Sequence, residues 1–311
     1  MQQQPNGKKE TYSPQVWAVG GGKGGIGKSV LSILIAMALA EKSQDIVVID
    51  GDLGGANLHT FMGIRTPGRT LNDFIERRYD TLDEVCIGTE QKGLRIICGA
   101  SEVLTLANLK YTQKTKILQA ISKIRADHVV LDLGAGTGFN TLDFFLSAHH
   151  QIVVMTPQPI AIQNAYAFIR NAVYRTLSRL TSRRPSLGDL VTTAMNPKNN
   201  MKVGTVNSLL DRVAENGAEA DAAEMASQLS RIRPTLITNM IRQPRDRNAS
   251  RIIQMVARKH LTISAQIGGS VYFDSHINAM VSNMEPLTRV ERESDAIQSS
   301  QSIVAQLALP N

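Results

Sequence analysis

A glycine-rich segment, GGKGGIGKS from Gly21 to Ser29, contains the residue types that bind a phosphate chain. Phosphate oxygens need several backbone N–H donors aimed into one small concavity, and glycines let the backbone turn tightly enough to supply them. The apolar run before the segment is typical of a strand, and the run after it of a helix, whose N-terminus adds a positive dipole. In this P-loop pattern Lys28 reaches the β- and γ-phosphates and the Ser29 hydroxyl binds Mg²⁺. The sequence therefore predicts a site for a nucleoside triphosphate and Mg²⁺.

Three aspartates lie at or just beyond the ends of β-branched runs. Asp50 and Asp52 follow one run, and Asp132 lies near the end of the run HVVLDL. Ligands of open α/β sheets collect at the carboxyl ends of the strands, where carboxylates can hold metal-bound water or orient an attacking water. Asp132 has the place of a Walker B aspartate, and the glycines from Gly134 to Gly138 predict a mobile loop suited to sensing a γ-phosphate.

These aspartates could also have either of two different roles. Asp50 or Asp52 could cap the helix that follows them. The run DLGAGTG from Asp132 to Gly138 also fits the DxGxGxG pattern of methyltransferases, which would require it to follow the first strand of its own domain. Its position far downstream of the glycine-rich loop is typical of Walker B, so the spacing favours a nucleotide-hydrolysing protein.

The loop resembles the deviant Walker A motif, KGGxGK followed by Ser or Thr, of the MinD/ParA (SIMIBI) family of P-loop ATPases. The run VVIDGDLGGANLHTFMG from Val47 to Gly63 resembles the family's switch I, and its LGxANL form is closest to the FlhG branch. The resemblance implies that Lys23 reaches across an ATP-sandwiched dimer to the partner's phosphates. It also implies that Asp50 supports the Mg²⁺ shell and that Asp52 positions the hydrolytic water.

Asn239, in the run ITNM, matches the family asparagine that reads the adenine edge. An amide carries both a donor and an acceptor, as base recognition requires, although an asparagine in a turn would fit the same position. The expected catalytic residues are Lys23, Lys28 and Asp52. The expected nucleotide-binding residues are Gly22, Lys23, Gly24, Gly25, Ile26, Gly27, Lys28, Ser29, Val30 and Asn239. The expected metal site comprises Ser29, Asp50 and Asp132, the two aspartates acting through water.

The run TPQPIAIQNAYAFIR, from Thr156 to Arg170, resembles the family segment TPEPTAITDAYALIK, which contributes to the dimer and partner face. Gln158, Ile160 and Asn164 stand where the family usually has Glu, Thr and Asp, so two acids of the usual partner face are missing. The run GSVYFD resembles the GYIPYD loop beside adenine, with Tyr272 in place of its proline. No residue role is carried over to that run.

Apolar β-branched runs alternate with stretches long enough for helices. Strands are expected at 16–20, 46–50, 94–98, 128–133, 151–155 and 235–240, with a further strand at 263–267. Continuous apolar strands that alternate with helices indicate a parallel sheet covered on both faces. The predicted fold class is therefore α/β, with a mostly parallel twisted sheet flanked by helices, and the resemblance implies a P-loop NTPase of the SIMIBI type.

The domain organisation is expected to be simple. Residues 1–14 predict a flexible tail, and residues 15–311 a single P-loop ATPase domain. Within that domain, about 185–230 is expected to be an inserted, partly helical segment because it is rich in Ala, Asn, Ser and Gly. A C-terminal helix is expected at about 295–308, with an apolar stripe that packs against the core.

A chain of 311 residues with 42% hydrophobic content can bury a large core, which excludes disorder throughout. The longest apolar run, from Val30 to Ala40, is interrupted by Ser32 and is too short to span a membrane. The N-terminus has no apolar segment, so no secretory signal is expected. Cys86 and Cys98 lie outside any His/Cys cluster, which argues against a disulfide scaffold or a zinc site and fits the cytoplasm.

The net charge of +7 favours an anionic partner. Between Arg233 and Lys259 seven basic residues face a single acid, Asp246. These residues could bind the DNA backbone or an anionic membrane surface, although solvated helix faces would account for them more simply. The arginines considered for such a surface are Arg175, Arg179, Arg183, Arg242, Arg245, Arg247 and Arg251.

Together these features predict a Mg-ATP-dependent, dimerising ATPase that acts as a spatial or regulatory switch, as in cellular positioning or the control of flagellar number. Hydrolysis to ADP and phosphate is expected to be slow and to be stimulated by a protein partner. The protein is expected in the cytoplasm, associated peripherally with membrane or nucleoid. The alternative is a ParA-like partition ATPase that binds DNA non-specifically. A scaffold without hydrolysis is disfavoured because the expected catalytic residues are all present.

Overall fold

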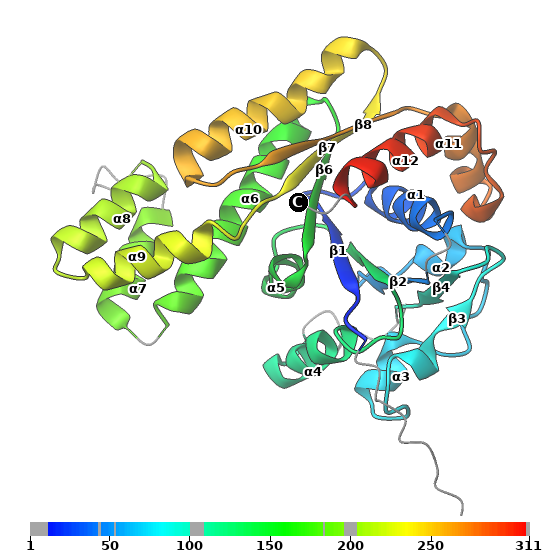
Figure 1. Cartoon of the computed structure of the whole chain (residues 1–311), viewed down its shortest axis with the longest axis horizontal. Coiled ribbons are helices and arrows are strands. Elements are labelled where there is room, and N and C mark those ends of the chain that lie inside the picture. Colours follow the sequence, from blue (N-terminus) through cyan, green and yellow to red (C-terminus); the bar gives the residue numbers. More distant parts are fainter. Residues whose placement is uncertain are drawn as a thin grey trace, which may run out of the picture.

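The computed structural model of the chain describes residues 12–42, 45–52, 54–99, 109–182, 184–195 and 204–308. In this part of the chain one twisted sheet runs through the molecule, and helices lie against both of its faces (Figure 1). Most of the predicted tail, 1–14, falls outside these residues, so its flexibility stays a prediction. None of the described helices combines the length and the apolar character that crossing a membrane requires.

The sheet has the order β3-β4-β2-β5-β1-β6-β7-β8 in the described residues. All pairs are parallel except β3 with β4, so the predicted α/β fold with a mostly parallel sheet is confirmed. The strands are β1 (Gln15–Gly20), β2 (Ile46–Gly51), β3 (Ile87–Gly88), β4 (Leu94–Ile97), β5 (His128–Leu133), β6 (His150–Met155), β7 (Thr235–Ile241) and β8 (Gln266–Tyr272).

The central strands are buried on both faces, which explains their continuous apolar sequences. In β1, Val16 and Ala18 pack into the core on one face, whereas Trp17 and Val19 pack into the core on the other. Successive side chains of a strand point to opposite faces, so both sets must be apolar when both faces are covered. A strand with this sequence is therefore expected only inside a sheet that is covered on both faces.

Helices α1, α2, α11 and α12 cover one face of the sheet, and α3 to α10 pack into the core on the other. The helices are α1 (Lys28–Ala40), α2 (Leu58–Phe61), α3 (Leu71–Ile75), α4 (Tyr111–Ile121), α5 (Phe139–Ser147), α6 (Pro159–Leu180), α7 (Pro185–Met195), α8 (Val206–Glu215), α9 (Glu219–Leu229), α10 (Asn248–Leu261), α11 (Ser275–Ser282) and α12 (Asp295–Leu307). Short 3₁₀ turns are η1 (Asp83–Val85), η2 (Pro244–Arg247) and η3 (Leu287–Arg289).

Helices α7, α8 and α9 occupy the region for which an inserted segment is predicted, and they lie together at one side of the molecule (Figure 1). Their buried side chains, among them Val191, Leu209 and Leu229, join the same core as α6 and the sheet. These helices therefore extend the main core. Whether they are an insertion relative to related chains stays a prediction.

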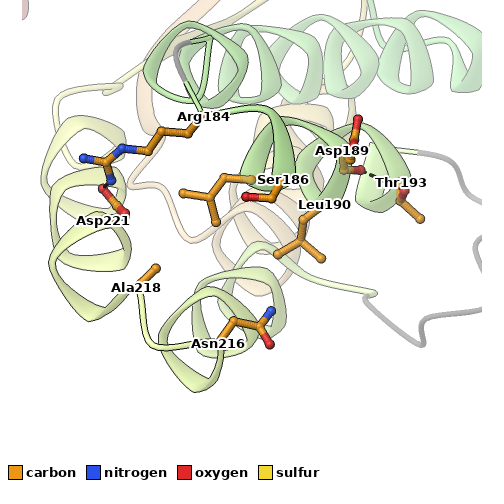
Figure 2. A pocket seen from close by; sticks show the side chains of 9 residues that line it. Arg184, Ser186, Asp189, Leu190, Thr193, Asn216, Ala218 and Asp221 are labelled. Carbon is orange, nitrogen blue, oxygen red and sulfur yellow. Dashed lines mark hydrogen bonds and ion pairs between the residues drawn. The ribbon is translucent and has the colours of Figure 1, made fainter.

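A hollow of about 840 Å³ lies between α7 and the turn that joins α8 to α9 (Figure 2). Arg184 and Asp221, which form an ion pair, line it together with Leu190 and Ala218. Its lining contains none of the residues predicted to bind nucleotide or metal. The hollow is therefore separate from the candidate site described below.

Two strands differ from the sequence-based expectation. The strand predicted at 263–267 is wrong in position, because β8 runs from Gln266 to Tyr272. Ile263 and Ala265 are buried in the connection before it, where they are 2% and 5% exposed, and burial alone accounts for their apolar character. The antiparallel strand β3 has no counterpart among the predicted strands, since two residues at a sheet edge are too short to produce a periodic pattern.

Trp17, the single tryptophan, is fully buried among histidines near the amino ends of the central strands. Its Nε1–H donates to Nδ1 of His128 at 3.0 Å, and its ring stacks on His150 with centroids 3.9 Å apart. Burial, together with the charges that His128 and His149 would carry, lowers the pKa of His150 to about 4. Burial also lowers the pKa of His128.

We expect the contribution of His150 to the free energy of unfolding to be lost as pH falls from about 6.5 towards about 4. Over this range the unfolded chain, in which the pKa of a histidine is about 6.5, binds protons that the folded protein resists, so protonation favours unfolding. Urea unfolding followed by far-UV circular dichroism at several pH values measures this slope. His150→Phe keeps a stacked ring without the titrating group and should reduce the slope. An unchanged slope in that variant would contradict the assignment.

Candidate functional site

The glycine-rich loop joins β1 to α1 and turns as its sequence predicts. Gly25 and Gly27 have φ values of 77° and 80°, a left-handed conformation that glycine adopts without strain. Gly27 is also the N-cap of α1, and within the described ranges no side chain caps that helix. The N–H groups of the first turn are therefore available to an anion, which the helix dipole would also favour.

The two lysines of the loop differ in burial. Lys28 is 8% exposed, and its Nζ donates to the carbonyl oxygen of Lys23 at 3.2 Å. Burial lowers the pKa of Lys28, while the negative charges of Asp132 and Asp52 oppose that shift. The side chain of Lys23 is exposed. One lysine is thus buried against the backbone of the loop, and the other is exposed.

Residues of α6 and β7 contact the backbone of the glycine-rich loop. A Cβ atom at Gly22 would lie 2.2 Å from the carbonyl oxygen of Asn164 in α6, so only glycine fits there. Asn239, at the end of β7, is 6% exposed, and its Nδ2 donates to the carbonyl oxygen of Ile26 at 2.9 Å. The structure therefore gives Asn239 a supporting contact with the loop that the sequence does not reveal, and its contact with adenine stays a prediction.

Asp50 and Asp132 lie side by side, because they are paired in register on the neighbouring strands β2 and β5. They are 1% and 2% exposed. Burial raises the pKa of Asp50 to about 7 and that of Asp132 to about 6. Hydrogen bonds from the Leu58 N–H to Asp50 and from Ser29 and Ser32 to Asp132 oppose these increases. The raised pKa values indicate that the positive charge nearby does not compensate for the burial of these two carboxylates.

The alternative role for Asp50, a helix cap, is also seen in the structure. Its Oδ2 accepts from the N–H of Leu58, the first residue of α2, at 2.9 Å, and its Oδ1 accepts from the N–H of Asp52 at 3.1 Å. A carboxylate has about four lone-pair sites, so these two bonds leave room for a metal-bound water. Asp50 therefore binds the backbone at both ends of the segment from Asp52 to Leu58 and still faces Asp132.

Asp52 lies against the loop that follows β5. A Cβ atom at Gly134 would lie 2.9 Å from Oδ1 of Asp52, so glycine is needed for the two loops to approach. A Cβ atom at Gly24 would lie 4.0 Å from the Cβ of Ala135, an ordinary van der Waals contact, so the glycine-rich loop and the loop after β5 are neighbours. The segments that carry Lys28, Asp52 and Asp132 therefore converge at the carboxyl edge of the sheet.

A mostly apolar cavity continues from the first turn of α1. It lies between α1, the ends of β7 and β8, and α11, and it contains the amide groups of Asn239 and Asn278. Aliphatic walls with a few amide groups suit a flat nucleobase. The run GSVYFD ends at this cavity, where the structure places it in β8 and the residues that follow. The lining residues are Val30, Leu31, Leu34, Asn239, Met240, Val271, Tyr272, Phe273, Asp274, Ile277, Asn278, Val281 and Ala296.

Ser32 belongs to the site, although it is not among the residues predicted from the sequence. Its Oγ is within 3.0 Å of both Oδ1 of Asp132 and the carbonyl oxygen of Lys28, and the residue is fully buried. Because this hydroxyl orients the carboxylate of Asp132, it acts as a positioning group. The available signal is a polar residue within the apolar run of α1, which by itself indicates only an interruption of that run.

Arg175 is paired within the protein, and its surface-binding role stays a prediction. Its guanidinium makes two hydrogen bonds of 2.8 Å to Asp143, which is 4% exposed, and Arg179 lies 3.8 Å from the same carboxylate. Asp143 precedes these arginines on another helix, so the sequence does not reveal that it pairs with them. Arg183 lies outside the described residues. The remaining four arginines are all exposed: Arg242, Arg245, Arg247 and Arg251. The guanidinium of Arg242 lies above the Phe273 ring, and that of Arg247 donates a hydrogen bond to the Tyr272 hydroxyl.

These residues fit Mg²⁺ and a nucleotide. The first turn of α1 lacks a side-chain cap. Lys28 lies in that turn, and among the described residues its ammonium group makes no hydrogen bond to a carboxylate. Asp50 and Asp132 are buried oxygen donors of the kind that Mg²⁺ binds through water. A divalent cation would supply the positive charge that these two carboxylates lack.

Comparison with known proteins agrees with this geometry. The family model described as ParA, NUBPL iron-transfer P-loop NTPase, matches residues 13–174, more than half of the chain. The chain belongs to the ParA/MinD family of P-loop NTPases. This membership confirms the resemblance inferred from Lys23 and the loop around it. It argues against a methyltransferase role for the segment from Asp132 to Gly138, which lies within the matched residues.

Several ParA/MinD relatives have names that describe regulation or positioning. Antiactivator FleN of Pseudomonas aeruginosa is 38% identical over 158 residues, which cover 50% of this chain and 55% of FleN. Flagellum site-determining protein YlxH of Helicobacter pylori is 33% identical over 160 residues, or 49% and 52% of the two chains. Septum site-determining protein MinD of Escherichia coli is 26% identical over 185 residues, or 59% and 68%. The matched region spans about half the length of FleN and of YlxH.

Solved structures of the same family share the fold over nearly the whole chain. A ParA family ATPase from Chlorobium tepidum aligns with a TM-score of 0.64 at 14% identity, covering 95% of this chain and 99% of the other. MinD complexed with Mg-ADP from Pyrococcus horikoshii aligns with a TM-score of 0.62 at 16% identity, covering 94% and 96%. The likeness therefore extends beyond the matched sequence, through α7 to α12.

Proposed function

We propose that this chain is a MinD-like ATPase that binds Mg-ATP, dimerises through it and hydrolyses it slowly as a spatial or regulatory switch. The observation that carries the proposal is the contrast between the two lysines of the loop. Lys28 is buried within its own phosphate site, whereas Lys23 is exposed on the outer side of the same loop. A cation in that position can reach the phosphates bound by a second copy of the chain.

The proposed reaction is the in-line attack of water on the γ-phosphate, which yields ADP and inorganic phosphate. Lys28 and the partner's Lys23 offset the charge that accumulates on the phosphate oxygens, and Asp52 orients the attacking water. Bound Mg²⁺ would supply further positive charge between the phosphates, held by Ser29 directly and by Asp50 and Asp132 through water. Ser32 keeps the Asp132 carboxylate aimed at that position.

The names of related proteins support a task for the proposed switch. FleN is named an antiactivator, and YlxH and MinD are named site-determining proteins of the flagellum and the septum. We propose the same kind of task here, with control of the flagellum as the leading case, carried out in the cytoplasm and driven by a protein partner that stimulates hydrolysis. A non-specific DNA-binding role as in ParA partition proteins is disfavoured, because the names of these relatives describe an antiactivator and site-determining proteins of the flagellum and the septum.

The test is the mass of the protein in solution with each nucleotide. Asp52→Ala should bind Mg-ATP, lose hydrolysis and accumulate as a dimer, because the γ-phosphate that holds the two copies together is no longer cleaved. Size-exclusion chromatography with light scattering should then show a monomer with ADP and a dimer with ATP.

The control for this test is Asp211→Ala on the exposed side of α8, which should behave as the wild-type protein does. If Asp52→Ala hydrolysed ATP at the wild-type rate, its assignment would be wrong. If the mass did not respond to nucleotide in any variant, the dimer and the role of Lys23 would both be rejected.

A further inference from the structure

A groove of about 430 Å³ lies at the amino edge of the sheet. It is bounded by the end of α5, the second half of α6 and the connection from α9 to β7. Gln151, the second residue of β6, lines it, whereas the glycine-rich loop follows the other end of the parallel neighbour β1. The groove is therefore separated from the candidate nucleotide site by the length of the central strands.

Two arginines line this groove from different elements, and no acidic residue is among its described lining. Arg179 belongs to α6, and Arg231 follows α9. Arg179 lies 3.8 Å from Asp143, but that carboxylate already accepts hydrogen bonds from Lys114 and Arg175, so one negative charge is shared by three cations. Within the described residues the guanidinium of Arg231 has no hydrogen bond or ion pair. The groove therefore has an excess of positive charge.

The side-chain amide of Gln151 offers a hydrogen-bond donor to the groove. Gln151 is 6% exposed, and its Oε1 accepts from the backbone N–H of Arg233 at 3.2 Å. In the part of the chain that the structure describes, its Nε2 donates to no acceptor. A nearly buried donor without an acceptor is unfavourable, so a ligand that accepts from this amide would gain stability from it.

Apolar side chains complete the groove. Leu146, Leu180 and Ile232 lie along it, so its lining combines aliphatic surface with a few polar groups, as small-molecule sites do. Its volume is also within the range of such sites, about 300–1000 Å³. The larger hollow beside α7 is less suited to an anion, because its Arg184 is already paired with Asp221 (Figure 2).

We propose that this groove, formed by Gln151, Arg179, Arg231 and the apolar side chains beside them, binds a small organic phosphate monoester. At pH 7 a phosphate monoester carries a charge of about −1.5 to −2 and has three terminal oxygens. Two guanidinium groups match that charge, and each presents a planar fork of donors that suits phosphate oxygens. A carboxylate carries a single charge on two oxygens, which one arginine can satisfy. The second arginine and the amide donor therefore favour phosphate.

Binding in the groove would be independent of the proposed nucleotide switch. Helix α6 passes both places: Asn164 lies against Gly22 of the glycine-rich loop, and Arg179 lies about 22 Å further along the helix axis. A small ligand cannot reach from one to the other. Of the described arginines considered for a DNA or membrane surface, only Arg179 lines the groove.

The experiment is isothermal titration calorimetry of the full chain with phenyl phosphate, whose ring supplies an apolar body. We expect binding to the wild-type protein and also to Lys28→Ala, because the groove does not use the glycine-rich loop. Benzoate, which has the same ring and one carboxylate, should bind at least about tenfold more weakly, since it engages one guanidinium fewer. This comparison separates phosphate from carboxylate as the recognised group.

Two variants test the groove directly. Arg179→Gln with Arg231→Gln should weaken binding of phenyl phosphate at least about tenfold, as expected when two charge-assisted contacts are lost. Gln151→Glu keeps an oxygen that can accept from the Arg233 N–H but replaces the amide donor by a negative charge. It should weaken binding of the probe by a similar factor.

Matched controls change the same kinds of group without touching the proposed contacts. Thr176 also lines the groove, but its hydroxyl donates to the carbonyl oxygen of Ala172 within α6 at 3.1 Å, so Thr176→Val should leave binding unchanged. Arg65→Gln with Arg212→Gln removes the same charge at exposed positions outside the groove. Far-UV circular dichroism verifies that each variant is folded, so a loss of binding is not a loss of structure.

The proposal is overturned if the wild-type protein does not bind phenyl phosphate. It is also overturned if Lys28→Ala loses the binding while Arg179→Gln with Arg231→Gln keeps it, because the probe would then occupy the glycine-rich loop. Equal losses in the two double arginine variants would reduce the effect to net charge, and benzoate binding as tightly as phenyl phosphate would exclude phosphate as the recognised group. None of these readouts requires ATP, so they are distinguishable from failure of the nucleotide-driven dimer.

Discussion

Lys28→Ala is expected to abolish binding of Mg-ATP while leaving the protein folded. In the proposed site the ammonium group is the cation that contacts the phosphates bound by its own chain, and its Nζ donates to the carbonyl oxygen of Lys23. Losing a desolvated contact between an ammonium and a phosphate costs roughly 2–5 kcal/mol, which corresponds to a dissociation constant higher by about thirtyfold to several thousandfold. Isothermal titration calorimetry with a slowly hydrolysed ATP analogue measures the change.

The same substitution should not destabilise the protein in the absence of nucleotide. Burial lowers the pKa of Lys28, whereas the charges of Asp132 and Asp52 oppose that shift, so the cost of burying the ammonium group is partly offset by its attraction to these carboxylates. The melting temperature without nucleotide should therefore remain close to the wild-type value. Lys23→Ala is the matched control, and it should keep nucleotide binding but lose the ATP-dependent dimer. Wild-type affinity in Lys28→Ala would exclude the proposed phosphate site.

Asp143→Ala is expected to produce the largest loss of stability. Asp143 is 4% exposed and is the shared partner of Lys114 on α4 and Arg175 on α6. Burial alone would raise the pKa of Asp143, but the hydrogen bonds from Arg175 and Lys114 outweigh it and hold the pKa below its usual value. Removing the carboxylate leaves two cations facing each other, one of them buried, and breaking a buried pair in this way costs about 3–5 kcal/mol.

Chemical unfolding monitored by circular dichroism measures this loss, and Asp143→Asn should recover only part of it because the amide carries no charge. The control is Glu90→Ala, which removes an ion pair with Arg289 in which both side chains are more than half exposed. Solvent screens such a pair, so the unfolding midpoint of that variant should change little. Equal losses in Asp143→Ala and Glu90→Ala would show that the buried cluster does not stabilise the fold.

The sequence predicts those features that are encoded by consecutive residues. The strands β1, β2, β5, β6 and β7 are continuous apolar runs, and the glycine-rich loop has its composition and spacing within nine residues, Gly21 to Ser29. Asp132 is expected at the site because its strand ends there. In each case the local pattern is sufficient, because strand burial and tight turns impose their requirements on neighbouring residues.

The sequence does not predict contacts between side chains that are far apart along the chain. Ser32 and Asp132 lie a hundred residues apart, and the cluster around Asp143 joins residues from α4, α5 and α6. Arg175 and Arg179, spaced along one helix, resemble a binding surface because their partner, Asp143, is on another element. Likewise, Arg179 and Arg231 line one groove only because α6 packs against α9.

The packing of α12 against α1 has a consequence for biosynthesis. Helix α1 is translated early, but the apolar surface that it presents to α12 is covered only after residues 295–307 have been made. At roughly 5–20 residues per second, the ribosome needs on the order of ten seconds or more to translate the intervening chain. During that interval the helix that begins at the phosphate loop exposes apolar surface. The nascent chain should therefore depend on chaperones until residues 295–307 have been made, and a functional nucleotide site should form only after that.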